Sequence, residues 1–159
     1  MIDAFLAAVE ASPIAEAMKT SRLAYPLVNA AHILSLATLF GAILSLDLRL
    51  LGAFRSVPVA PLAELLPKIA AGGLATALLT GFALFAVEPF EYAANPALQI
   101  KLLLVAIGVI HALWLHTRPS WRDASSIGNV SVSVKASAFV SLCVWTLAIF
   151  AGRFIGFIG

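Results

Sequence analysis

Three histidines are the side chains in this sequence whose type and surroundings could support chemistry. His32 lies in the apolar stretch VNAAHILSLATLFG, and His111 and His116 lie in NPALQIKLLLVAIGVIHALWLH. An ionisable residue at membrane depth is costly and is more often functional than its counterpart in a soluble protein. Each imidazole is therefore either a helix-packing residue with a local hydrogen bond or a metal ligand.

Few other reactive groups accompany the histidines. The one cysteine, Cys143, can form neither a disulfide nor a thiolate cluster within a single chain. Two methionines are too few for a copper path. The sequence contains no recognisable nucleotide-binding loop, Ser-His-Asp constellation or carboxylate pair. These observations argue against a hydrolase and leave open whether the protein is an enzyme.

Haem iron is the metal that the histidines suit best, because neutral imidazole is a good iron ligand and helical bundles hold haem between facing helices. At 1.5 Å per residue, His32 lies roughly 12 Å below the outer ends of the expected helices, His111 roughly 21 Å and His116 roughly 28 Å. We therefore expect His32 and His111 to ligate haem b and His116 to be interfacial. The alternative is a packing role, which stabilises a membrane protein by about 1 kcal/mol per hydrogen bond.

Three basic residues are candidates for holding the haem propionates. Arg22, Lys101 and Arg153 all fall near the outer ends of the expected helices, on the side of His32. Cations of this kind would form charge-assisted hydrogen bonds to a carboxylate. They could equally extend to lipid phosphate or pair with Glu88 and Glu91.

The scaffold for these residues must be a membrane domain. The chain is 62% hydrophobic and 11% charged, with a mean hydropathy of +1.02, which is too apolar for a soluble domain. Its uncharged runs come close to the length of about 20 residues that crosses a bilayer. They predict an all-α integral membrane four-helix bundle, a single domain over residues 1–159, with transmembrane helices at about 24–50, 64–87, 97–117 and 131–157.

The N-terminal segment is predicted to be short amphipathic helices over about residues 2–20. Ile2, Phe5, Leu6 and Val9 follow a helical spacing, and Ser12-Pro13 is typical of an N-cap followed by a first-turn proline. Such helices lie along a membrane surface or cover the end of the bundle. The first basic residue is Lys19, so the segment does not resemble a cleaved signal peptide.

The basic residues predict the orientation. The loop arginines Arg55, Arg118 and Arg122 all fall on one side of the membrane, which the positive-inside rule assigns to the cytoplasm. Both termini are then periplasmic in a bacterial inner membrane. Juxtamembrane basic residues also explain the net charge of +2, so no nucleic-acid partner is needed.

The motif DLRLLG, Asp47–Gly52, closes the first expected membrane helix. We expect Asp47 and Arg49 to emerge at the cytoplasmic interface, with Arg49 reaching phosphate and Gly52 ending the helix. With YPLVNAAHILSLATLFGA and NPALQIKLLLVAIGVIHALWLH, the motif resembles a family of uncharacterised bacterial four-helix inner-membrane proteins. That family is distantly similar to copper-resistance D-type and b-type cytochrome membrane domains. The resemblance covers about residues 20–150 and implies roles for His32, Asp47, Arg49 and Lys101.

Together these features favour a b-type haem subunit that passes electrons between the quinone pool and a periplasmic or membrane redox partner. The alternative is a non-catalytic accessory subunit that packs into a larger respiratory or photosynthetic complex. Its partners would be the bilayer and other membrane redox subunits or further copies of itself. A proton or metal transporter is less favoured, because Asp47 and Glu88 are expected only at helix ends and provide no acidic relay.

Overall fold

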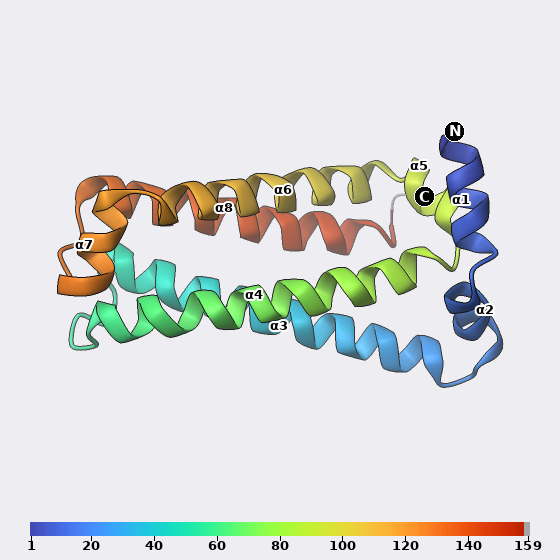
Figure 1. Ribbon diagram of the computed structural model, residues 1–159, viewed down its shortest axis with the longest axis horizontal. Coiled ribbons are helices and arrows are strands. Elements are labelled where there is room, and N and C mark those ends of the chain that lie inside the picture. The colour runs from blue at the N-terminus through green and yellow to red at the C-terminus, as the bar shows by residue number, and fades with distance from the viewer. Residues whose placement is uncertain (158–159) are drawn as a thin grey trace.

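The computed structural model describes residues 1–157, and the regular elements in that range are all helices. Four of them are long: α3 (Ala24–Leu51), α4 (Val59–Phe85), α6 (Pro96–His116) and α8 (Val132–Phe154) (Figure 1). Each is long and apolar enough to cross a membrane. The predicted class, an all-α membrane protein with four candidate spans, is confirmed. Residues 158 and 159 of the expected single domain lie outside the described range.

The long helices pack in the spatial order α4, α3, α8, α6. Helix α3 contacts α4 along its length and also contacts α8, and α8 contacts α6. Figure 1 shows the two pairs, α3 with α4 and α6 with α8, running side by side along the long axis of the molecule. Helices α3 and α8 are therefore central, and the buried polar residues Ser35, Asp47 and Ser137 lie on them.

Short helices cover both ends of the bundle. Helices α1 (Ile2–Glu10), α2 (Pro13–Thr20) and α5 (Pro89–Ala94) lie at one end, called here the α5 end. Helix α7 (Pro119–Ile127) lies at the other, the α7 end, beside the α3–α4 connection. As predicted, Ser12 caps α2, because its hydroxyl accepts a hydrogen bond from the Ala15 amide over 3.3 Å. Helix α1 packs on α5, and α2 packs on α3 and α4.

The helix boundaries differ most from the sequence prediction at the start of α4 and the end of α8. Helix α4 begins at Val59 instead of residue 64, because Pro58 is its extended N-cap residue and proline is tolerated in a first turn. Pro67 lies inside this helix. Helix α8 ends at Phe154 instead of residue 157, and the amide group of Asn95 donates to the Ile155 carbonyl over 3.2 Å. That bond satisfies one of the carbonyl groups left open at the helix end.

Small residues allow α3 and α4 to approach closely. Gly73 is buried against α3, and a Cβ atom on it would lie 2.8 Å from the Leu39 amide nitrogen and 3.0 Å from the Ser35 carbonyl oxygen. Ala77 follows one turn later and is buried. Ala77 and Gly81 thus continue a stripe of small residues on α4 that begins at Gly73.

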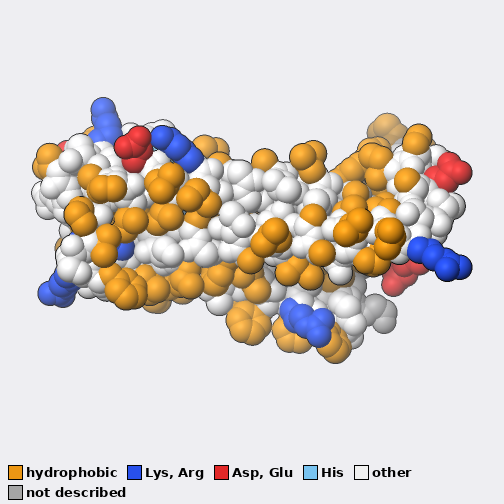
Figure 2. All heavy atoms as spheres, turned by 90° about the horizontal axis from the view of Figure 1, so that it is seen from below, with side chains coloured by type: hydrophobic (Ala, Val, Ile, Leu, Met, Phe, Trp, Pro, Cys, Tyr) orange, Lys and Arg blue, Asp and Glu red, His pale blue; other side chains and the backbone are white. Residues whose placement is uncertain are grey.

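The surface of the bundle matches a membrane environment. Large apolar side chains are exposed on every long helix, and Figure 2 shows them spread over the length of the molecule, with charged side chains mostly towards the two ends. At the α7 end a buried apolar cluster joins α3, α4, α6, α7 and α8. It consists of Leu46, Leu50, Val59, Ala63, Leu115, Trp121, Ala124, Val134 and Ala138.

Candidate functional site in the membrane interior

His32 projects from α3 towards α4, where its Nδ1 lies 2.9 Å from the Thr80 hydroxyl oxygen. That hydroxyl donates its only proton to the Thr76 carbonyl over 2.7 Å. The Thr80 oxygen is therefore the acceptor in its contact with His32, and Nδ1 carries the imidazole proton. This tautomer leaves a lone pair on Nε2, the atom through which a histidine held by a polar neighbour can bind a metal.

Gly81 gives the His32 ring its space. A Cβ atom at Gly81 would lie 3.1 Å from Cε1 of His32, closer than ordinary packing contacts. Thr80 and Gly81 together orient the ring: one holds its Nδ1 and the other leaves room beside it. Both lie on α4, so the site depends on the close packing of α3 and α4.

Lys101 is the one predicted propionate partner that lies near His32. It projects from α6, close enough for its ammonium group to interact electrostatically with the His32 ring. Its side chain lies along Gly152 of α8, where a Cβ atom would be 3.3 Å from Cδ of Lys101. Arg22 and Arg153 are exposed, and the Arg153 guanidinium lies 4.6 Å from the ring centroid of Phe157.

His111 projects from α6 towards α8 and forms a separate contact. Its Nε2 lies 3.0 Å from the hydroxyl oxygen of Ser137, a buried residue. Ser137 adjoins Ala138, which packs in the same apolar cluster as Leu46. His32 precedes Leu46 on α3 by almost four turns, or roughly 20 Å. The structure therefore does not bring His32 and His111 together at one site.

His116 lies at the α7 end of α6, as expected for an interfacial residue. Its Nδ1 donates to the Ala112 carbonyl over 2.7 Å, and its ring centroid lies 4.6 Å from that of Trp121. Its side chain is exposed. Within residues 1–157, no group of three His, Cys, Asp or Glu side chains is arranged to hold a metal ion.

The expectation that Asp47 emerges at the interface is wrong. Asp47 is 6% exposed, because its side of α3 faces α8, where the Ser141 side chain interacts with the carboxyl group. Its Oδ2 has no hydrogen-bond partner in the described part of the chain. A buried carboxyl oxygen without a partner is costly. Asp47 therefore adds a polar group to the bundle interior, where its position near the end of α3 does not predict one.

The rest of the DLRLLG motif ends α3. Gly52 adopts a φ of 109°, which favours glycine, and closes the helix as predicted. The Arg49 guanidinium turns to the α3–α4 connection, where Nε donates to the Val57 carbonyl over 2.6 Å and Nη2 to the Arg55 carbonyl over 3.4 Å. One function of Arg49 is thus to hold this connection against the end of α3.

The fold and these interior contacts define a multi-pass membrane protein with polar side chains inside a small helical bundle. Comparisons with known protein families, with curated proteins and with solved structures found no match to this chain.

Proposed function

We propose that the protein is a haem b-binding electron-transfer subunit, with His32 as an axial ligand. The observation that carries this proposal is the contact of His32 with the Thr80 hydroxyl, whose own proton goes to the Thr76 carbonyl. Thr80 holds Nδ1–H over 2.9 Å, and the Nε2 lone pair stays available in a low-dielectric interior. Haem bound here would supply one-electron redox chemistry between the quinone pool and a periplasmic or membrane partner.

Two residues near His32 support this proposal. Gly81 lets the His32 ring pack against α4 in a fixed orientation, and Lys101 places a cation in the same interior region, where it would pair with a propionate. Thr80 would fix the ring orientation and raise the basicity of its free nitrogen. His111 would serve a different site, because its Nε2 is engaged with Ser137 at another height of the bundle.

The proposed location is a bacterial inner membrane with the α7 end in the cytoplasm and both termini in the periplasm. The support is the position of basic residues at that end, on the α3–α4 connection and around α7. They are Arg49, Arg55, Arg118, Arg122 and Lys135.

The test is an absorption spectrum with a pyridine haemochrome assay on protein expressed with adequate haem. We expect a b-type Soret band that His32→Ala abolishes, that Thr80→Val shifts, and that Lys101→Ala weakens through loss of haem on dilution. His116→Ala is the matched control and should leave the spectrum unchanged. A folded, colourless wild-type protein would refute the proposal.

A second candidate function, a non-catalytic accessory subunit, rests on a different feature of the same histidines. Each interior imidazole contacts a hydroxyl group on the neighbouring helix, His32 with Thr80 and His111 with Ser137. Histidines that only join helices would have this arrangement. In that case the protein is colourless, and His32→Ala and His111→Ala each lower stability by about 1 kcal/mol.

A further inference from the structure

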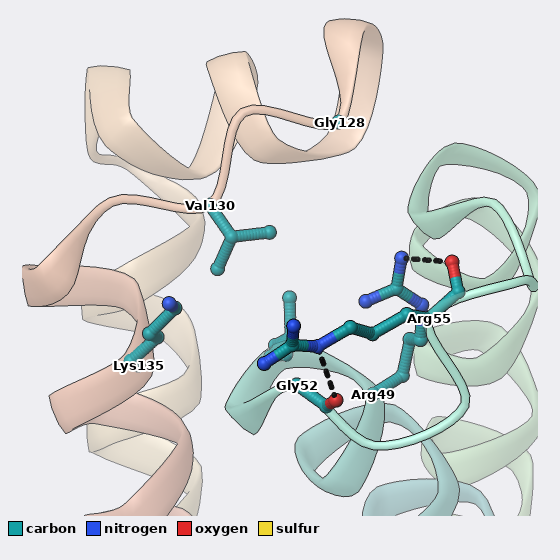
Figure 3. Close-up of a pocket in the computed structure, with 7 residues that line it drawn as sticks. Arg49, Gly52, Arg55, Gly128, Val130 and Lys135 are labelled. Carbon is teal, nitrogen blue, oxygen red and sulfur yellow. Dashed lines mark hydrogen bonds between the residues drawn. The ribbon is translucent and has the colours of Figure 1, made fainter.

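A basic cavity lies at the α7 end, away from His32. Its volume is about 390 Å³, and it opens between the α3–α4 connection and the α7–α8 connection. Figure 3 shows Arg49 and Arg55 on one side of this cavity and Lys135, from the first turn of α8, across from them. Gly52 and Gly128 contribute backbone to its walls. Three cations from separate chain segments thus line one cavity.

No carboxylate neutralises these three cations among residues 1–157. The ion pairs formed there are Lys19 with Glu10 and Lys68 with Glu64. The two arginines bond to backbone carbonyls instead, as in the 3.2 Å bond from Nε of Arg55 to the Gly52 carbonyl. Neutral carbonyls orient a guanidinium but leave its charge uncompensated, so the cavity favours an anion.

The surroundings of the cavity suit an amphiphilic anion. Leu50 lines its inner side and belongs to the buried apolar cluster. Large apolar side chains are exposed on the connections that form the cavity or directly beside them: Phe54 is 67% exposed, Ile127 74% and Val132 83%. These side chains would contact acyl chains next to a bound headgroup, a contact that a free inorganic anion cannot make.

The backbone of the α3–α4 connection is shaped to place Arg55 in this position. Gly52 ends α3 in the left-handed region, and Phe54 adopts a φ of 50°, which is uncommon for a residue with a side chain. Arg55 then folds back over Gly52, with Nη2 3.8 Å from the position of a Cβ atom on that glycine. The guanidinium is therefore positioned before any ligand arrives, which lowers the entropic cost of binding.

We propose that this basic cavity binds the phosphate group of an anionic phospholipid headgroup. Basic cavities between membrane helices on the cytoplasmic side bind such headgroups, and the α7 end is cytoplasmic in the orientation proposed above, on which this step rests. Arg55 and Lys135 would bind the phosphate oxygens from opposite sides, and Arg49 would hold the connection that carries Arg55. The headgroup would tie α3 to α8 at the end of the bundle.

The experiment measures binding of short-chain phosphatidylglycerol to the full chain in neutral detergent by native mass spectrometry. Short-chain phosphatidylcholine and inorganic phosphate are the comparison probes. The variants are Arg55→Ala, Lys135→Ala and their combination, because both side chains are exposed and their removal leaves the core intact. Arg122→Ala is the matched control, since Arg122 is an exposed cation of α7 that does not line the cavity.

We expect the wild type to bind phosphatidylglycerol more tightly than phosphatidylcholine. The double variant should lose roughly tenfold in affinity, while Arg122→Ala keeps the wild-type value. Lys135→Arg, which keeps the charge, should bind nearly as well as the wild type. Three outcomes would overturn the proposal. The wild type could bind phosphatidylglycerol and phosphatidylcholine equally, the double variant could bind phosphatidylglycerol as tightly as the wild type, or inorganic phosphate could compete for the cavity as well as the lipid does. The last outcome would assign the cavity to a free anion.

Discussion

The close backbone contact of α4 with α3 at Gly73 gives the sharpest prediction. Gly73→Ala places a methyl group 2.8 Å from the Leu39 amide nitrogen, 3.0 Å from the Ser35 carbonyl oxygen and 3.1 Å from the Leu39 Cα. All three atoms belong to the backbone of α3, so none can rotate away. The adjacent Gly72 is the matched control, because a Cβ atom there meets nothing within 4 Å.

The size of the effect follows from these contacts. Carbon atoms pack best at about 3.5–4.0 Å, so α3 and α4 would have to separate by several tenths of an ångström or more near Gly73. Overpacking of this kind costs about 1–3 kcal/mol. The gain of about 1 kcal/mol from replacing glycine by alanine in a helix applies to both variants. Their difference therefore isolates the packing cost, and we expect Gly73→Ala to be less stable than Gly72→Ala by about 1–3 kcal/mol.

The assay is unfolding of the purified protein by SDS in mixed micelles, followed by tryptophan fluorescence. Helices largely persist in SDS, so the midpoint reports mainly on helix packing. The separation of α3 and α4 would also move Thr80 away from His32. If the wild type binds haem, the Gly73→Ala variant should therefore lose its haem more readily than the wild type does. Equal midpoints for the two alanine variants would refute the proposed close contact.

Three further perturbations test other parts of the structure. Asp47→Leu should stabilise the protein by about 1–3 kcal/mol, because it removes a buried carboxyl oxygen without a partner in the described chain; a loss of stability on SDS unfolding would contradict this. Burial, with a contribution from Tyr25, raises the pKa of Tyr92 from 10.0 to about 12. The stability linked to this phenol is therefore complete below pH 10 and is lost as the pH rises towards 12, and ultraviolet titration should show a late phenolate step that Tyr92→Phe removes. A cysteine at Ser56 in a Cys143→Ala background should be protected from impermeant thiol reagents in intact cells, and its labelling would reverse the proposed orientation.

Hydropathy alone was sufficient to predict the membrane class and the four long helices. A bilayer demands about 20 apolar residues per span, and this demand is local in sequence, so the uncharged runs mark the helices without tertiary information. Local rules also predicted the cap at Ser12 and the glycine that ends α3 at Gly52. The start of α4 was harder to predict, because Pro58 and Pro61 are typical of a loop until Pro58 is known to be the N-cap residue and Pro61 to lie in the first turn.

The neighbours of each polar side chain depended on the tertiary structure. The helical positions of His32 and His111 are visible in the sequence, but only the packing shows that one contacts α4 and the other α8. The structure also placed Asp47 against α8, although its distance from the helix end suggested an interfacial residue. Within a membrane all long helices are apolar all round, so hydropathy does not reveal which face of a helix meets which neighbour. Steric fit at small residues such as Gly73, where backbones can approach, determines that pairing.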